Sequence, residues 1–154
     1  MPAYYLDSSA LVKRYVTETG CAWVHALCAD AANALFISEL ALMEVGSAYA
    51  RRCHRGEITD EQRRNYLDVF IYDCTETYHL IAAGRSLIER GLDLTQRRYL
   101  RAYDAMQLAS ALAANAALTL AGLPALTFVS ADDGLLHAAN AEGLQTENPN
   151  VPIT

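Results

Sequence analysis

The sequence predicts an α/β protein, a three-layer sandwich in which helices cover both faces of a central parallel sheet. Short apolar runs alternate along the chain with longer segments of helical periodicity, as they do where crossover helices connect parallel strands. The apolar runs are nearly continuous, which is typical of strands buried on both faces. With 154 residues, 53% of them hydrophobic, the chain is expected to form one domain over residues 1–154.

Four apolar runs are the candidate strands of this sheet. They are residues 3–8 (AYYLDS), 34–39 (ALFISE), 77–83 (TYHLIAA) and 125–131 (ALTFVSA). The tail, residues 145–154, is expected to add a short edge strand before Pro149 and Pro152 break regular structure. The predicted sheet therefore has four to five strands.

The segments between the strands carry helical periodicity, and several have start or stop signals. Thr59 with Gln62 three residues later is close to a capping box, which predicts a helix start. Gly56, Gly122 and Gly143 each follow a periodic segment and predict its end. The expected helices are 9–16, 20–32, 39–56, 59–74, 84–92, 102–122 and 132–144, with a basic loop between the fifth and the sixth.

The composition excludes several classes of protein. No apolar run approaches the roughly 18 residues that a membrane span needs, and the N-terminus lacks the basic region of a signal peptide. The four cysteines form no CxxC pair and the four histidines are scattered singly, so no zinc site is indicated. We expect a cytoplasmic protein with reduced thiols and no membrane partner.

The basic residues are clustered although the net charge is -6. Eleven of the twelve are arginine, the side chain best suited to bidentate phosphate contacts. The clusters are residues 51–55, 63–64 and 97–101. They are either a surface for a nucleic-acid backbone or simply solvated helix faces.

Acidic residues follow the predicted strands at the points where a parallel sheet binds its ligands. Asp7 ends the first strand, Glu44 lies early in the helix after the second, and Asp104 opens the long helix. Asp132 and Asp133 follow the fourth strand. Since the carboxyl ends of parallel strands share one edge, these carboxylates are expected to converge there. Their repulsion favours a bound cation, and ligand oxygens without Cys or His favour Mg²⁺ or Mn²⁺.

Each acid also has a purely structural interpretation. Asp7, Asp104 and Asp132 can each cap or complement a helix N-terminus. Glu44 is harder to explain in this way, because it lies in an apolar stretch with no basic residue one turn away on either side. Glu39 and Asp133 are possible supporting acids. The neighbouring serines, Ser8, Ser9 and Ser130, can bond a carboxylate, a metal water or a phosphate, or only satisfy backbone groups.

Four segments together resemble the PIN-domain family, and within it the VapC-type toxins of bacterial and archaeal toxin–antitoxin pairs. The segments are YYLDSSALVKRY, ISELALMEVGSAYARR, YDAMQLASALAA and FVSADDGLLHAANAEGL, and they extend over essentially the whole chain. The resemblance implies a PIN-like sheet of order 3-2-1-4-5. It also implies a site made of Asp7, Glu44, Asp104 and Asp132, with Asp133 at most an outer ligand.

The activity that this resemblance implies is Mg²⁺-dependent endoribonuclease cleavage, with Mn²⁺ as a substitute. The four acids would hold one or two ions, and a water acidified by the metal would attack phosphorus in line, leaving a 5′-phosphate. The implied partners are an RNA substrate, a VapB-type antitoxin and a second copy in a homodimer. The alternative is a PIN-type RNA-binding or RNA-processing protein without an antitoxin, including a noncatalytic one.

Two other folds that gather acids at a sheet edge fit less well. A receiver-type phosphoacceptor needs a Lys after a late strand, but the single Lys of this chain, Lys13, lies in the first helix. A haloacid-dehalogenase-type phosphatase needs a second Asp two residues after Asp7, where this chain has Ser9.

Overall fold

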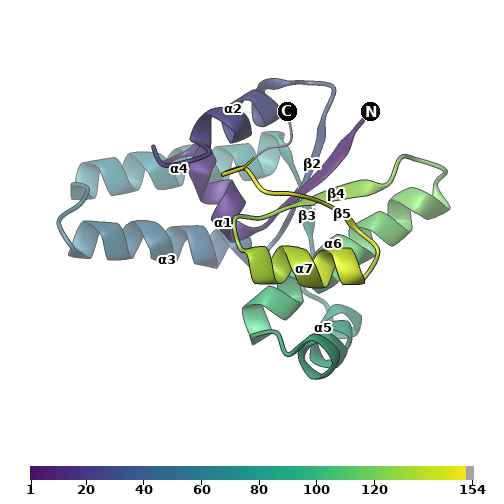
Figure 1. The fold of residues 1–154 in the computed structure, drawn as a ribbon. Helices are drawn as coiled ribbons and strands as arrows, with labels where there is room; N and C mark the ends of the chain where they lie inside the picture. Colours follow the sequence, from purple (N-terminus) through teal and green to yellow (C-terminus); the bar gives the residue numbers. More distant parts are fainter. Residues whose placement is uncertain (152–154) are drawn as a thin grey trace.

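A computed structural model of the protein describes residues 1–151 and confirms the three-layer architecture around a parallel sheet (Figure 1). The five strands lie in the order β3-β2-β1-β4-β5, and every neighbouring pair is parallel. This is the order that the resemblance implied, and the tail contributes the expected edge strand. The strands are β1 (Ala3–Leu6), β2 (Ala34–Ser38), β3 (Tyr78–Ile81), β4 (Leu126–Val129) and β5 (Gln145–Glu147).

Helices cover both faces of the sheet. In Figure 1, α3 and α4 project together from one side as a long hairpin, and α5 and α6 lie below the sheet. None of the helices within residues 1–151 is long and apolar enough to cross a membrane. The helices are α1 (Ser8–Leu11), the 3₁₀ turn η1 (Val12–Arg14), α2 (Cys21–Ala29), α3 (Ala41–His54), α4 (Asp60–Glu76), α5 (Arg85–Arg98), α6 (Ala102–Leu120) and α7 (Asp133–Ala141).

Two hydrophobic cores lie on opposite faces of the sheet. Successive side chains of β1 point to opposite faces, so Tyr5 joins the core under α5, α6 and α7, whereas Leu6 joins the core under α1 to α4. Tyr5 stacks on Phe128 of β4 with ring centroids 5.5 Å apart. Burial on both faces explains why the strands read as continuous apolar runs.

The predicted start and stop signals of the helices are confirmed. The hydroxyl of Thr59 accepts a hydrogen bond from the backbone of Gln62, whose side chain accepts one from the backbone of Thr59, so α4 begins with a complete capping box. Glycines with positive φ follow the ends of α3, α6 and α7, at Gly56, Gly122 and Gly143. These local signals work because they satisfy backbone groups at helix ends without help from the rest of the chain.

The expected basic loop before α6 is wrong, because α5 continues to Arg98. Gly91 does not end this helix. It is buried against α6, where a Cβ atom would lie 3.0 Å from Sδ of Met106, so the glycine allows the two helices to pack closely. The helix ends instead at Tyr99, which has a left-handed φ of 56°.

A polar cluster joins the hairpin to the body of the protein. Asp73 of α4 is buried, and its carboxylate accepts a hydrogen bond from the hydroxyl of Tyr15 at 2.7 Å. The same carboxylate pairs with the guanidinium of Arg14 at 3.2 Å. Arg14 in turn donates to the hydroxyl of Tyr78 at 2.8 Å. These bonds link α4 to the segment after α1 and to β3.

Candidate metal centre

Asp7 lies directly after β1 and is almost completely buried, with 4% of its surface exposed. One carboxylate oxygen accepts hydrogen bonds from the hydroxyl of Ser9 at 2.7 Å and the backbone N–H of Ala10 at 2.9 Å, which makes Asp7 the N-cap of α1. The other oxygen accepts one from Ser130 at 2.7 Å. Burial raises the pKa of Asp7 to about 6 in spite of these bonds, and the charge of Asp104 adds to the rise. Asp7 is therefore a helix cap and also a member of an acidic cluster.

Glu44 lies in the first turn of α3 and is half-buried. Burial, followed by the charges of Asp7 and Asp104, raises its pKa to about 7. One carboxylate oxygen accepts a hydrogen bond from the amide of Gln107 at 3.3 Å. No purely structural role accounts for this carboxylate, because it caps no helix and makes no ion pair within residues 1–151.

Asp104 and Asp132 complete the acidic cluster. Asp104 lies in the first turn of α6, and its pKa is raised by burial and by the charge of Asp132. Asp132 is exposed and caps α7, accepting a hydrogen bond from the backbone of Leu135 at 3.0 Å. The structure thus brings all four predicted acids within electrostatic range of at least one other member.

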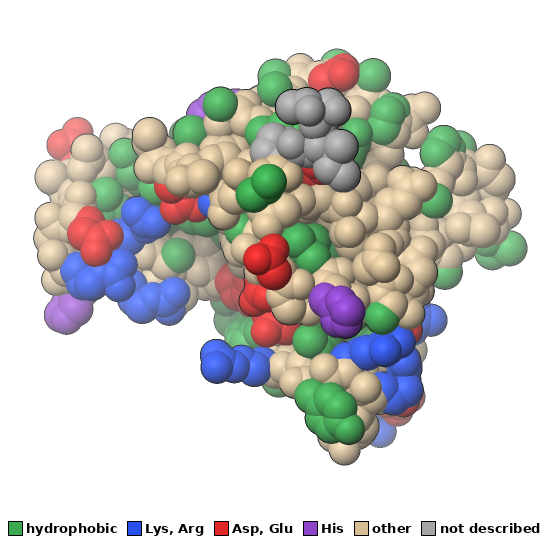
Figure 2. Space-filling view, viewed as in Figure 1, with side chains coloured by type: hydrophobic (Ala, Val, Ile, Leu, Met, Phe, Trp, Pro, Cys, Tyr) green, Lys and Arg blue, Asp and Glu red, His purple; other side chains and the backbone are tan. Residues whose placement is uncertain are grey.

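The charges of this cluster are not neutralised by neighbouring side chains. In the described part of the chain, no Lys or Arg forms an ion pair with any of the four acids, and only the more distant Arg101 acts on Asp104. Figure 2 shows acidic side chains gathered in the hollow beside the projecting hairpin. A group of like charges with one buried member, Asp7, is costly unless a cation lies among them, so the donor set fits a divalent ion.

The side chains are not drawn together into a complete set of direct ligands. Among residues 1–151, no three Asp, Glu, His or Cys side chains stand close enough to hold a metal ion directly. Mg²⁺ usually keeps several waters and binds through only one or two carboxylates, so a more open cluster still fits this ion. Zn²⁺ would require a tighter group with Cys or His ligands.

The two supporting acids have structural partners elsewhere. Glu39 is exposed and accepts a hydrogen bond from the backbone of Ala83 at 2.7 Å, which connects the end of β2 to the loop after β3. Asp133 is also exposed and accepts one from the side chain of Asn148 at 2.9 Å.

Two of the flanking serines orient Asp7. The hydroxyls of Ser9 and Ser130 both donate to its carboxylate. The same hydroxyls accept hydrogen bonds from the backbone of Ala131 and Asp132, at 2.9 and 3.0 Å. The serines therefore satisfy backbone groups and hold the carboxylate at the same time, and they connect the loop after β4 to the start of α1.

Gln107 belongs to the site but is absent from the sequence-based prediction. Only 4% of it is exposed, and its side-chain oxygen accepts a hydrogen bond from the hydroxyl of Tyr5 at 2.6 Å. Its amide nitrogen points to Glu44 and to the hydroxyl of Ser8, at 3.3 and 3.2 Å. The available signal was a polar side chain one turn after Asp104 in an Ala-rich helix. In the described part of the chain, Gln107 is the one side chain that donates a hydrogen bond to Glu44, so it orients that carboxylate.

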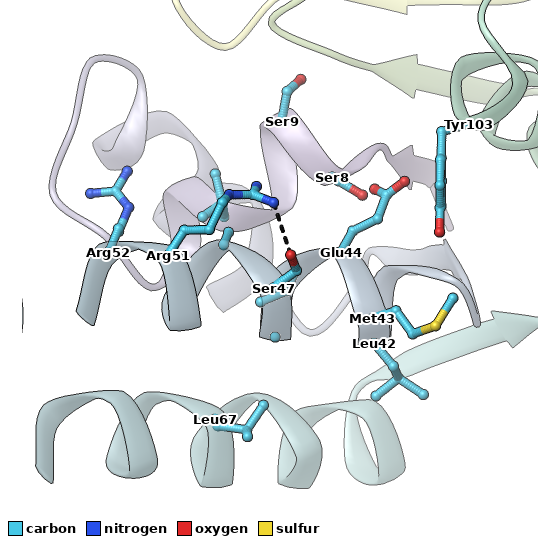
Figure 3. A pocket seen from close by; sticks show the side chains of 14 residues that line it. Ser8, Ser9, Leu42, Met43, Glu44, Ser47, Arg51, Arg52, Leu67 and Tyr103 are labelled. Carbon is cyan, nitrogen blue, oxygen red and sulfur yellow. Dashed lines mark hydrogen bonds between the residues drawn. The ribbon is translucent and has the colours of Figure 1, made fainter. Parts of the chain in front are cut away.

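A groove of about 960 Å³ leads away from Glu44 along α3. Figure 3 shows Ser8, Glu44 and Tyr103 together at one end, and Ser47, Arg51 and Arg52 farther along the helix. Its remaining lining includes the apolar side chains Leu42, Met43 and Leu67.

A parallel sheet of order 3-2-1-4-5 with carboxylates at its carboxyl edge defines the PIN-like class of α/β/α proteins. Comparison of the sequence with family models gives the same assignment. The chain belongs to the PIN-domain family, whose model matches residues 4–140.

Two curated relatives come from Mycobacterium tuberculosis: Ribonuclease VapC45 of strain CDC 1551 / Oshkosh and Ribonuclease VapC49 of strain ATCC 25618 / H37Rv. Each is 33% identical to this chain over 147 residues, which is 93% of both sequences.

Solved structures share the fold at lower sequence identity. Mycobacterium tuberculosis VapC20, described as a sarcin–ricin loop cleaving toxin, superposes with a TM-score of 0.64 at 14% identity, over 97% of this chain and 99% of that one. VapBC2 from Rickettsia felis, bound to a DNA fragment of its promoter, gives a TM-score of 0.63 at 16% identity. The match covers 95% of this chain and 98% of that one.

Proposed function

We propose that this protein is a Mg²⁺-dependent endoribonuclease that acts as the toxin of a toxin–antitoxin pair. The observation that carries the proposal is a cluster of four carboxylates, from four different segments, with no ion-pair partner among the described residues. Curated relatives named ribonucleases match over nearly the full length, which supports this activity over others that use an acidic sheet edge.

In this proposal Asp7, Glu44, Asp104 and Asp132 hold the ion, directly or through waters. When bound, Mg²⁺ or Mn²⁺ would acidify the attacking water and stabilise negative charge on the phosphate and the leaving oxygen. Asp7 is kept in place by the hydroxyls of Ser9 and Ser130, and Glu44 by the amide of Gln107. The expected products carry a 5′-phosphate and a 3′-hydroxyl.

The proposed partners are a VapB-type antitoxin and a second copy of the chain. Support for the antitoxin comes from structural neighbours that include toxin–antitoxin complexes, such as VapBC-1 from nontypeable Haemophilus influenzae, with a TM-score of 0.61 at 12% identity. Co-purification of a co-expressed antitoxin and the mass of the free protein in solution test these two partners separately.

Cleavage of a mixed cellular RNA pool tests the activity. Wild-type protein and Asp7→Asn are incubated with Mg²⁺, with Mn²⁺ and with EDTA, and the fragment ends are analysed. We expect fragments with 5′-phosphates only for the wild type and only with metal. Equal cleavage by Asp7→Asn, or cleavage in EDTA, would refute the metal site. Absence of cleavage by folded wild-type protein would instead favour the noncatalytic RNA-binding alternative.

A further inference from the structure

Three polar side chains form a line along the face of α3 that borders the groove. Ser47 is three residues after Glu44, and Arg51 is seven residues after it, so the three side chains lie on one face of the helix. At 1.5 Å per residue, Arg51 lies about 10 Å along the axis from Glu44. All three line the groove, and Ser8 and Ser9 of α1 line it too, with Ser8 beside Glu44 (Figure 3). The groove therefore runs from Glu44, one member of the acidic cluster, to a guanidinium group.

Arg51 differs from most other arginines because it has no carboxylate partner among the residues that the structure describes. Its guanidinium donates to the hydroxyl of Ser47 at 2.8 Å, and the side chain is exposed. Of the eleven arginines, eight form ion pairs and three form none within residues 1–151. The eight are Arg14, Arg52, Arg55, Arg63, Arg64, Arg85, Arg97 and Arg98, and the three are Arg51, Arg90 and Arg101.

This pairing changes the interpretation of the basic clusters. Within residues 51–55, the charges of Arg52 and Arg55 are matched by Glu18 and Glu57, at 3.5 and 2.6 Å. The guanidinium of Arg51 has N–H donors left over after its bond to a neutral hydroxyl. In the groove, it is the cation best able to take a phosphate without giving up an existing ion pair.

Tyr103 adds a second feature suited to RNA at the other end of the groove. It is 48% exposed, follows the N-terminus of α6 and lies beside Glu44 in the groove lining (Figure 3). Exposed aromatic rings bind single-stranded RNA by stacking on its bases. The exposed side chains of Leu42 and Met43 extend this apolar surface along the start of α3.

We propose that this groove binds a single strand of RNA as it leaves the acidic site. Arg51, oriented by Ser47, holds a backbone phosphate within a few nucleotides of the scissile bond, and Tyr103 stacks on a base next to that bond. This inference rests on the proposed function and adds to it the path of the substrate. A partner peptide is the competing occupant, because Leu42, Met43 and Leu67 also line the groove. The uncompensated guanidinium in line with the acidic cluster favours the polyanion.

RNA binding that does not depend on cleavage tests the path. The probe is a fluorescein-labelled oligouridylate, and its anisotropy is followed with the Asp7→Asn protein in Mg²⁺ over a range of salt concentrations. Arg51→Met, Arg51→Lys and Arg90→Met are added to this background. Arg90 is the matched control, because it also lacks an ion pair in the described chain but lies on α5, outside the groove.

We expect Arg51→Met to weaken binding roughly fivefold or more, the effect of one lost charged phosphate contact. The slope of log affinity against log salt should become smaller by about 0.7, the value for one phosphate of a single strand. Arg51→Lys should restore the slope, and Arg90→Met should change neither quantity. In otherwise wild-type protein, Arg51→Met should raise KM more than it lowers kcat.

Several results would overturn the inference. They are equal effects of Arg51→Met and Arg90→Met, an unchanged salt slope, or no binding of the oligouridylate by Asp7→Asn protein. A loss of binding to a co-expressed antitoxin without loss of RNA affinity would assign the groove to a peptide. Failure of the proposed nuclease is seen separately, as RNA that is bound with the expected salt slope but never cleaved by wild-type protein.

Discussion

Replacement of Asp7 by Asn should stabilise the protein when no metal is present. The carboxyl group is buried, and its pKa is raised from 3.8 to about 6, so its charge is disfavoured in the folded state. A rise of this size corresponds to a cost of about 3 kcal/mol at neutral pH. Asn removes the charge but keeps only one acceptor oxygen, a loss of about 1–2 kcal/mol. The net gain is about 1–2 kcal/mol, or roughly 2–8 °C in Tm.

The sign of this effect depends on pH. Because the folded-state pKa lies above that of the unfolded chain, the wild type loses stability as pH rises from about 4 to about 6, and the cost is complete above that range. The advantage of Asp7→Asn is therefore largest at pH 7–8, disappears near pH 5 and is reversed at lower pH, where only the lost hydrogen-bond acceptor counts. Mg²⁺ should reverse the order at neutral pH, since only the wild type gains binding energy from it.

Thermal unfolding of both proteins in EDTA and in Mg²⁺, at several pH values, measures these shifts. Asp68→Asn is the matched control, because Asp68 is exposed on α4 and its replacement changes the net charge equally. If Asp7→Asn melts below the wild type at pH 8 in EDTA, or if Asp68→Asn gives the same gain, the argument from buried charge is refuted.

Three further predictions concern the site and the stability of the fold. Mn²⁺ affinity, measured by calorimetry, should fall as pH is lowered from 8 to 5. The reason is that the pKa values of Glu44 and Asp7 are raised to about 7 and about 6, so both carboxylates take up protons over this range. A flat pH profile would contradict their role as ligands. Gln107→Met should weaken Mn²⁺ binding, because the hydrogen bond to Glu44 is lost. It should also lower the free energy of unfolding by about 1–3 kcal/mol, because the buried hydroxyl of Tyr5 loses its acceptor. Unchanged Mn²⁺ affinity would limit Gln107 to a structural role. Gly20→Ala should lower Tm more than Gly56→Ala does. Both glycines have positive φ, but only at Gly20 would the new Cβ meet other backbone, 2.6 Å from the carbonyl oxygen of Pro149. Equal losses of Tm would show that this clash relaxes freely.

The acidic site could be predicted from the sequence because its members follow from local rules. Asp7 and Asp132 come directly after buried strands, and Glu44 and Asp104 lie in the first turns of helices. In a parallel sheet all these positions belong to one edge, whatever the details of packing. The metal that the cluster holds and the reaction that it performs stay predictions for the cleavage and binding experiments.

Local signals also predicted most element boundaries. The alternation of strands and helices, the capping box at Thr59 and the glycines after α3, α6 and α7 each act within a few residues of sequence. The continuation of α5 past Gly91 could not be predicted in this way. Gly91 lies against α6 and allows the two helices to pack closely, a contact with another segment that its own sequence neighbours do not reveal.

The sequence by itself thus determined the fold class and the edge of the sheet where acids gather, since both follow from periodicity and from the common direction of parallel strands, whereas the choice of four acids came from the family resemblance. Tertiary structure alone decided how charged and polar side chains are paired. Gln107 of α6 donates to Glu44 of α3, and Arg97 pairs with Glu142, which is forty-five residues away in the sequence. Such pairings depend on distances between segments that no local pattern encodes. Within residues 1–151 they leave Arg51 at the groove without an ion pair, and this makes it the arginine to test first.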